Sequence, residues 1–238
     1  MFFKEFFSKK SKQRKKANST LNNLNTKSIP DAQNDIENFH IHLPNNIQIL
    51  AITDTHGYIP DELYKISDQD YDVCFLMGDL TQKDLDILKN ILNLDKTYGI
   101  IGNHNYLNFL EENDIKNIHG KQIIVNGISF VGWGGSIMYK PSLDLGFDGF
   151  SDVSSCAFAK QLPNADVLIS HDGPMIDELN TSHSGLKGIT EYLTDRTTKL
   201  HIHGHFHQNT ISKVGAAKSI CIFRAAFIDQ NGNVRKIC

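Results

Sequence analysis

Four histidines stand at alternating positions in the stretch LHIHGHFHQN, residues 200–209. Alternate side chains of a β-strand point to the same face, so this spacing is typical of a strand with one histidine-rich face. Neutral imidazole is also the commonest metal ligand among side chains, so the same residues could bind metal ions. The four residues, which flank Gly204, are His201, His203, His205 and His207. The rest of the chain has to decide between the two interpretations.

Polar residues that suit metal binding follow five short apolar runs, at residues 47–53, 72–77, 98–101, 166–170 and 200–203. Nearly continuous apolar runs of this length are typical of strands buried on both faces. Ligands gather at the carboxyl ends of strands in α/β sheets, so we expect the polar residues to meet at one edge. Carboxylate, imidazole and amide donors suit Mn, Fe or Zn better than copper. The polar residues are Asp54 and His56, Asp79 after Gly78, Asn103 and His104 after Gly102, His171, and His205 and His207 after Gly204.

Each cluster taken alone has an ordinary structural explanation. Asp and His are common at turns, and a Gly-Asp pair after a strand is often only a turn. Asn103 tolerates a left-handed backbone and could belong to a plain loop, and a single histidine such as His171 is more often packed than a ligand. The order and placement of all five clusters together favour a shared site.

In this order the clusters resemble the calcineurin-like metallophosphoesterase family. The family pattern is DxH, GD, GNH followed by an acidic residue, H, and GHxH, and the resemblance covers about residues 46–238. It implies two mixed β-sheets packed face to face with helices outside, a four-layer α/β sandwich. It also implies hydrolysis of a phosphomonoester or phosphodiester by a hydroxide that bridges two divalent ions. Manganese is the expected metal, with Fe, Zn, Ni or Mg as alternatives.

The resemblance also implies a ligand set for each of the two ions, with Asp79 as the bridge between them. His104 is not implied as a ligand; it would face the phosphate, stabilise developing charge or protonate the leaving oxygen. The first ion would be held by Asp54, His56, Asp79 and His207, and the second by Asp79, Asn103, His171 and His205. His201 and His203 would then be packed residues that precede the ligands.

Two departures narrow the expected activity. Asn105 stands where the family usually has an acidic residue; an amide can hydrogen-bond the His104 ring but adds no charge, so we expect a functional His104 with a less elevated pKa. No Arg-Gly follows Asp79 in GDLTQKD, so the chain does not resemble phosphoprotein Ser/Thr phosphatases. It is more similar to small bacterial phosphoesterases of the cyclic-nucleotide or general phosphodiester type.

Two other kinds of protein remain as alternatives. A non-catalytic scaffold of the same fold would be expected to lack metal ligands, whereas all seven positions are filled here. A structural or transport metal-binding protein explains the ligands but not His104, which is not needed to hold a metal. The substrate partner is expected to be a phosphorylated small molecule or nucleotide-like compound. The oligomeric state is left open.

The elements expected around the clusters predict a layered α/β protein with mixed sheets. Helical patterns occur at residues 83–92 and 105–113, and a hairpin at 122–133 turns at Asn126-Gly127. A second hairpin is expected from strands at 219–228 and 233–237. Substrate contacts could come from residues 181–188, a Gly/Ser-rich helix entry, although an ordinary helix start is the favoured explanation there. They could also come from residues 133–152, which a surface loop explains equally well.

Composition and charge limit the domain organisation and the kinds of partner that we expect. The chain has 238 residues, 40% of them hydrophobic, which suits one larger globular domain or two small ones. We expect a basic tail without fixed fold over residues 1–45 and one domain over 46–238. Residues 1–16 carry seven Lys or Arg and one Glu, against 17 basic and 26 acidic residues in the remainder, so stable nucleic-acid binding is not expected.

The expected location is cytoplasmic. The four cysteines are widely spaced, no apolar run reaches the length of a membrane span, and the N-terminus lacks a secretory signal. Phe2, Phe3, Phe6 and Phe7 precede a basic run, so residues 1–16 could make a weak contact with a membrane surface, or could be a plain tail.

Overall fold

The computed structural model describes residues 39–138, 149–175 and 184–237. The phenylalanine-rich segment and nearly all of the expected tail therefore lie outside the described residues. So do half of the segment 133–152 and the first three residues of 181–188.

The first sheet has six strands in the order β12-β11-β1-β2-β3-β4. Strands β1 to β4 run parallel to one another, β11 runs antiparallel to β1, and β12 runs antiparallel to β11. The sheet is therefore mixed. Its strands are β1 (Gln48–Thr53), β2 (Val73–Leu76), β3 (Thr97–Gly99), β4 (Lys116–Asn117), β11 (Arg224–Asp229) and β12 (Val234–Lys236).

The second sheet also has six strands, in the order β5-β6-β7-β8-β10-β9. Its four central strands are parallel, and an antiparallel strand closes each edge. Its strands are β5 (Gln122–Val125), β6 (Ile128–Trp133), β7 (Val167–Ser170), β8 (Leu200–His203), β9 (Thr210–Val214) and β10 (Ala217–Cys221).

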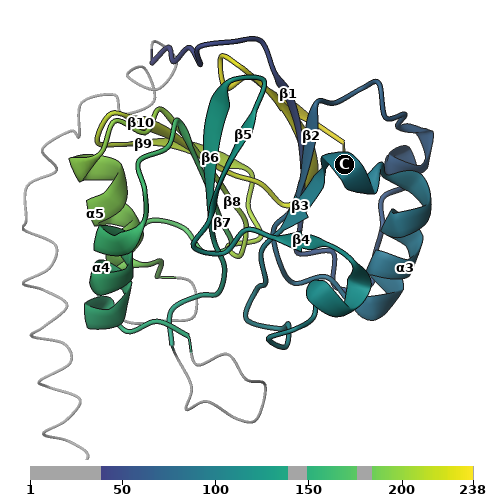
Figure 1. Ribbon diagram of the computed structural model, residues 1–238, viewed down its shortest axis with the longest axis horizontal. Helices are drawn as coiled ribbons and strands as arrows, with labels where there is room; N and C mark the ends of the chain where they lie inside the picture. Colours follow the sequence, from purple (N-terminus) through teal and green to yellow (C-terminus); the bar gives the residue numbers. More distant parts are fainter. Residues whose placement is uncertain (1–38, 139–148, 176–183, 238) are drawn as a thin grey trace, which may run out of the picture. The chain divides into compact units, whose positions relative to one another are not determined.

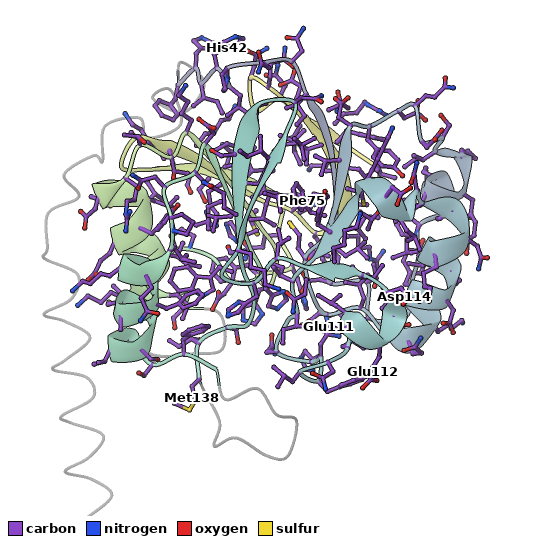
Figure 2. All side chains as sticks on the ribbon, viewed as in Figure 1. His42, Phe75, Glu111, Glu112, Asp114 and Met138 are labelled. Atoms are coloured by element: carbon purple, nitrogen blue, oxygen red, sulfur yellow. The ribbon has the colours of Figure 1, made fainter. Side chains whose placement is uncertain are left out.

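The main hydrophobic core lies between the two sheets. Along β1, Ile49 and Ala51 join this inner core, whereas Leu50 and Ile52 pack on the opposite face of the same strand. Phe75 of β2 lies in the interior with its ring 5.1 Å from that of Phe130 on β6, so the two sheets meet face to face (Figure 2). Burial on both faces explains why the strand sequences are continuously apolar.

Helices cover the outer faces of both sheets (Figure 1). Helix α3 (Gln82–Ile91) packs Leu85 and Leu88 against the first sheet. Helices α4 (Asp152–Gln161) and α5 (Lys187–Asp195) pack against the second sheet, where Ile189 and Leu193 of α5 are fully buried. The order helix, sheet, sheet, helices confirms the expected four-layer α/β sandwich.

The prediction of a helix at residues 105–113 is wrong. This stretch forms turns and only a short 3₁₀ helix, η3 (Glu111–Asn113). The side chain of Asn105 binds backbone groups outside the stretch, a contact that competes with helix formation. Conversely, helix α4 was not predicted, because only Ser155 and Ala159 of its ten residues are buried and its apolar pattern is weak.

The strand expected at residues 219–228 is in fact two strands in different sheets. The first half belongs to β10 of the second sheet and the second half to β11 of the first sheet. The chain crosses over at residues 222–223, and Arg224, the first residue of β11, has a left-handed φ of 72°. Local apolar patterns do not distinguish one strand from two consecutive ones, so the prediction merged them.

Both expected hairpins are present. Strands β5 and β6 are joined by Asn126 and Gly127, with φ angles of 50° and 74°, and two positive angles are the mark of the expected type I′ turn. Strands β11 and β12 form the C-terminal hairpin.

Residues before the expected boundary near 45 also contact the core. Ile41 and Leu43 are buried between the sheets, and the backbone N–H of Leu43 donates to the carbonyl of Gln230. Within the described ranges, the helices are all too short or too polar to cross a membrane.

Candidate metal centre

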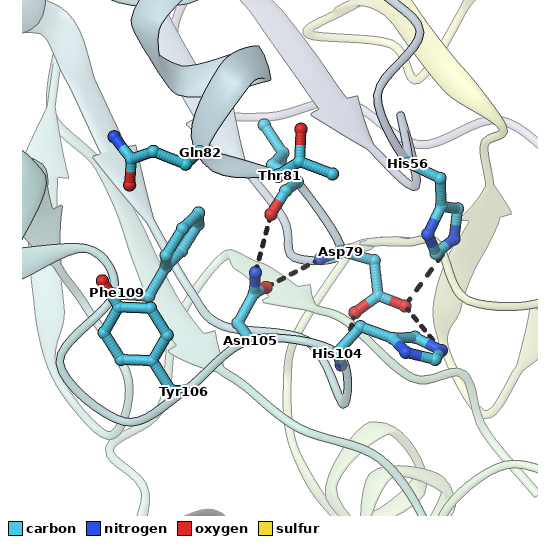
Figure 3. Close-up of a pocket in the computed structure, with 9 residues that line it drawn as sticks. His56, Asp79, Thr81, Gln82, His104, Asn105, Tyr106 and Phe109 are labelled. Atoms are coloured by element: carbon cyan, nitrogen blue, oxygen red, sulfur yellow. Dashed lines mark hydrogen bonds and ion pairs between the residues drawn. The ribbon is translucent and has the colours of Figure 1, made fainter. Parts of the chain in front are cut away.

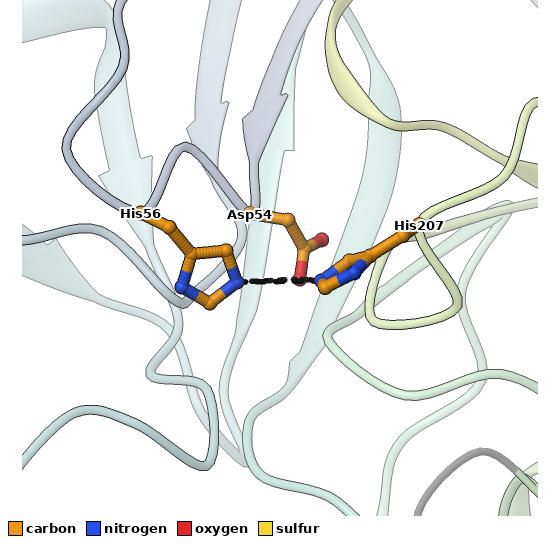
Figure 4. A group of neighbouring side chains, drawn as sticks. All are labelled: Asp54, His56 and His207. Atoms are coloured by element: carbon orange, nitrogen blue, oxygen red, sulfur yellow. Dashed lines mark hydrogen bonds and ion pairs between the residues drawn. The ribbon is translucent and has the colours of Figure 1, made fainter.

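Asp54, His56 and His207 form the first group of possible metal ligands, because one donor atom from each lies within 4.8 Å of the others (Figure 4). The Nε2 atom of His207 is 3.3 Å from Oδ1 of Asp54 and 3.3 Å from Nε2 of His56. Asp54 and His56 follow β1, and His207 follows β8, so the group joins the ends of strands from both sheets. Donors at these distances surround a space of the size that one cation occupies.

Asp79, His171 and His205 form the second group, again with donor atoms within 4.8 Å of one another. All three residues are buried. Oδ2 of Asp79 lies 3.5 Å from Nε2 of His171, and Oδ1 of Asn103 lies 3.0 Å from the same nitrogen. Asn103 therefore stands beside this group, where the sequence placed it.

One oxygen atom, Oδ2 of Asp79, faces both groups. It is 3.5 Å from Nε2 of His171 in the second group and 3.9 Å from Nε2 of His56 in the first. Nε2 of His104 is also 3.9 Å away. The structure thus brings all seven candidate ligands and His104 to the carboxyl ends of the strands, with Asp79 between the two groups.

The backbone at the site is unusual. Five non-glycine residues of the two groups have left-handed φ angles between 45° and 64°, namely Asp54, His56, Asp79, His205 and His207. Each such residue costs about 1–3 kcal/mol and persists only where surrounding contacts require it. The clustering of this strain on the proposed ligands indicates that the fold is selected for the position of their side chains.

Two glycines are required because neighbouring side chains lie where a Cβ atom would stand. A Cβ atom on Gly102 would overlap the carboxylate of Asp79, and one on Gly204 would overlap Oδ2 of Asp54 and Oγ1 of Thr53. No other residue type fits at these two positions without displacing a proposed ligand. This explains why the clusters contain glycine beside the chemistry-bearing residues.

Each carboxylate uses one oxygen for the protein and turns the other toward the site. Oδ2 of Asp54 accepts hydrogen bonds from Thr53 Oγ1 at 2.7 Å and from the backbone N–H of His205 at 2.8 Å. Its Oδ1 is buried and, among the described residues, faces Nε2 of His207 at 3.3 Å without an assigned hydrogen bond. Similarly, Oδ1 of Asp79 accepts from the backbone N–H of His104 at 2.9 Å, which leaves Oδ2 for the site.

His171 is oriented in the same way. Its Nδ1 donates to the carbonyl of Met77 at 2.8 Å, so in the neutral ring the lone pair of Nε2 points toward Asp79. In the first group, Oδ1 of Asp54 is buried without an assigned donor among the described residues, and in the second group Nε2 of His171 is aimed at Asp79; both features favour a bound cation. The donor set of the site therefore fits divalent metal ions.

The electrostatics of the site also favour added positive charge. Burial lowers the pKa of His171, but the carboxylates of Asp79 and Asp54 outweigh burial and raise that pKa to about 9. Burial opposes ionisation of Asp79, yet His171 and the hydrogen bond from His104 lower the pKa of its carboxyl group. Two buried carboxylates thus favour a cation at this place, which can be a proton on His171 or a divalent metal in its stead.

The four alternating histidines separate into two pairs. The rings of His201 and His203 are buried and stacked, with centroids 4.8 Å apart, and burial lowers the pKa of both. His201 lies between Ser170 Oγ at 2.7 Å and Ser219 Oγ at 2.8 Å, so it cross-links three strands of the second sheet. His205 and His207 belong to different ligand groups.

Asn105 does not contact the ring of His104 as the sequence suggested. Its Oδ1 accepts from the backbone N–H of Asp79 at 2.9 Å, and its Nδ2 donates to the carbonyl of Leu80 at 2.8 Å (Figure 3). The same Oδ1 also accepts from the backbone N–H of Gly102 at 3.0 Å. The amide therefore ties together two loops that carry proposed ligands. The side chain of His104 is 61% exposed at the mouth of the site.

Asp84 is a supporting residue that sequence reasoning missed. It is fully buried, and its Oδ2 accepts hydrogen bonds from Thr55 Oγ1 at 2.7 Å, Gly57 N at 2.9 Å and Thr81 N at 2.8 Å. These bonds attach the turn that carries Asp54 and His56 to the start of α3. The sequence signal that could have identified Asp84 is the capping box at the start of α3, in which Asp84 stands three residues after Thr81.

A four-layer α/β sandwich with two carboxylate–imidazole groups at shared strand ends defines the class of metallophosphoesterases. The chain belongs to the calcineurin-like phosphoesterase superfamily, whose domain model matches residues 47–223. No curated protein sequence matches the chain.

Solved structures show the same fold. The protein TT1561 of Thermus thermophilus superposes with a TM-score of 0.58 at 15% identity, over 82% of this chain and 100% of that chain. A 5′-nucleotidase from Candida albicans superposes with a TM-score of 0.51 at 16% identity, over 79% of this chain and 48% of that chain. This chain thus spans about half the length of that nucleotidase.

Proposed function

We propose that the protein is a metal-dependent phosphoesterase that hydrolyses a phosphomonoester or phosphodiester of a small molecule or nucleotide. The observation that carries this proposal is the position of Asp79 Oδ2 between two groups of candidate ligands. A protein that only stores one metal has no use for two groups with a shared carboxylate. Membership of the phosphoesterase superfamily supports the same conclusion.

The residues that would hold the metals are those that the sequence indicated. Asp54, His56, Asp79 and His207 would hold one ion, and Asp79, Asn103, His171 and His205 the other. Carboxylate, amide oxygen and imidazole donors suit Mn, Fe or Zn, and we propose manganese. The chemistry that such ions supply when bound is Lewis acidity, which neutralises phosphoryl oxygens and makes hydroxide available near neutral pH.

The chain's own residues position the substrate and handle its protons. The backbone N–H of His104 is held by Asp79 Oδ1, so its ring stands over the shared carboxylate while remaining open to solvent. From there the ring can donate a hydrogen bond to a phosphoryl oxygen or a proton to the leaving alkoxide. Burial opposes the ionisation of Asp54 and Asp79, but the surrounding imidazoles outweigh burial and lower the pKa of both carboxyl groups.

The alternatives of a scaffold or a metal-binding protein are less well supported. A scaffold would need neither the buried Oδ1 of Asp54 facing His207 nor the strained backbone of five candidate ligands. A metal-binding protein would need no exposed imidazole at the mouth of the site. His104 provides one, without belonging to either ligand group.

The test is hydrolysis of bis-p-nitrophenyl phosphate and p-nitrophenyl phosphate with and without added Mn²⁺, at a measured metal content. We expect turnover that chelation abolishes and Mn²⁺ restores. The ratio of diester to monoester rates then shows whether the protein is mainly a phosphodiesterase or a phosphomonoesterase. Asp79→Asn should abolish activity, while Asp86→Asn, an exposed change on α3, should leave it intact. Two metals per chain with no turnover of either ester would favour the metal-binding alternative.

A further inference from the structure

A cavity of about 240 Å³ opens beside Asp79 and His104 (Figure 3). We propose that this cavity, here called the aromatic pocket, binds the organic group of the phosphoester and selects an apolar or aromatic group of about one ring. The inference rests on the proposed function, because the pocket starts at the residues assigned to phosphate chemistry. It is lined by His56, Asp79, Leu80, Thr81, Gln82, His104, Asn105, Tyr106 and Phe109.

The pocket connects directly to the candidate metal centre. His56 and Asp79 are candidate ligands and His104 is the proposed proton donor, and all three form one end of the pocket. A phosphoryl group bound there would direct one of its ester substituents into the cavity. The remaining walls therefore contact the part of the substrate that distinguishes one phosphoester from another.

The two amide side chains of the pocket are already occupied. Asn105 uses its oxygen and its nitrogen for backbone groups of the surrounding loops. Gln82 exchanges hydrogen bonds with Asn113, donating at 2.6 Å and accepting at 3.0 Å, and donates to Asp86 at 2.9 Å. A sugar-like group with many hydroxyls would find few free partners there, and leaving polar groups unpaired is costly.

The apolar wall of the pocket is built from Leu80, Tyr106 and Phe109. Leu80 and Phe109 are almost fully buried, whereas Tyr106 is 39% exposed and reaches the opening. The rings of Tyr106 and Phe109 meet edge to face, with centroids 5.4 Å apart and planes at 79°. The hydroxyl of Tyr106 donates to Oε2 of Glu112 at 2.6 Å, so the ring is held in place before a ligand arrives.

Size limits the ligand further. Pockets for drug-sized molecules span roughly 300–1,000 Å³, and the aromatic pocket, at about 240 Å³, is smaller. It therefore suits a single ring or a compact apolar group. Aromatic rings that pack on other rings gain about 0.5–1.5 kcal/mol beyond the burial of their area, so an aryl group should be preferred to a methyl group.

Two non-hydrolysable phosphonates test this inference by calorimetry on the Mn²⁺-loaded protein. Phenylphosphonate and methylphosphonate share the same anionic head, so the contribution of the metals cancels in the ratio of their dissociation constants. We expect phenylphosphonate to bind about tenfold more tightly. Tyr106→Ala should reduce the ratio to about twofold, and Tyr106→Leu, which retains apolar surface, should give an intermediate ratio.

Tyr64→Ala is the matched control, since Tyr64 is 52% exposed and lies outside the pocket. It should keep the wild-type ratio. Equal binding of the two phosphonates, or a ratio that Tyr106→Ala leaves unchanged, would overturn the pocket while leaving the proposed function intact. If neither phosphonate binds and no ester is hydrolysed, the proposed function and the pocket both fail.

Discussion

Replacing Asp84 by alanine should both destabilise the fold and weaken one half of the metal centre. Three donors from two segments converge on its Oδ2 atom, namely Thr55 Oγ1, Gly57 N and Thr81 N. A hydrogen bond to a charged group contributes about 1.5–3 kcal/mol, and the three bonds share one acceptor and do not add fully. We therefore expect Asp84→Ala to lower the free energy of unfolding by about 3–5 kcal/mol.

The conservative variant Asp84→Asn separates charge from shape. Its amide oxygen can occupy the position of Oδ2, and its nitrogen takes the position of Oδ1, which is buried without a hydrogen-bond partner. We expect a smaller loss, about 1–3 kcal/mol, because the charge is lost and the buried amide nitrogen lacks an acceptor. Asp86→Ala, exposed on the same helix, is the control and should change stability by less than about 0.5 kcal/mol.

Urea unfolding measures these differences, and calorimetric titration with Mn²⁺ measures the effect on the site. Asp84 supports the turn with Asp54 and His56 through two hydrogen bonds, whereas toward the second group it bonds only the backbone of Thr81, two residues after Asp79, among the described residues. Asp84→Ala should therefore weaken binding of one ion and retain the other. Wild-type stability in Asp84→Ala, or equal weakening of both ions, would refute this account of how the first group is held.

Three histidines give further predictions. His104→Ala should lower kcat by about 10²–10⁴-fold with both metals retained; an unchanged kcat would remove His104 from the mechanism. His205→Ala should reduce the metal content from two ions to one, measured by elemental analysis; a variant that still binds two ions would overturn the assignment of this ligand. His201→Ala should keep both ions but lower the free energy of unfolding at pH 7 by about 2–4 kcal/mol, because it leaves a cavity and two unpaired hydroxyls. Burial holds the pKa of His201 well below 6.5, so the wild type loses stability as the pH falls below about 6.5, where the unfolded chain takes up a proton that the native ring does not. The variant lacks this loss, and the difference between the two proteins should narrow by about 1.4 kcal/mol per pH unit; a constant difference between pH 7 and pH 5 would show that the ring is not held neutral.

Much of the architecture could be predicted from local patterns. Five apolar runs correspond to five strands, because burial on both faces of a sheet leaves a continuous apolar signal. The turn at Asn126-Gly127 was predictable because two positive φ angles are cheap only for such residues. Helix α4 and the crossover before Arg224 were missed, since neither is marked by a periodic apolar pattern.

The candidate ligands were suggested by residue type at strand ends and assigned by the family resemblance, and the structure gathers them all. Their supports were not predictable in the same way. From the sequence, Asn105 could hydrogen-bond the adjacent His104 ring, yet it binds the backbone of Asp79 and Leu80, 25 or 26 positions away. Which partner an amide selects depends on what the fold brings within 3 Å, and sequence adjacency does not decide it.

Local sequence signals were enough to establish which residue types stand at the ends of the strands, because strand, turn and glycine patterns are local. They also established the superfamily, through the order of the five clusters. Only the tertiary structure decided which residues of one type lie at the metal centre and which are packed elsewhere. Asp54 and His205, 151 positions apart, are joined by a hydrogen bond of 2.8 Å, while His201, four residues before His205, faces two serines instead. Contacts of this range follow from the packing of two sheets, and no local pattern records them.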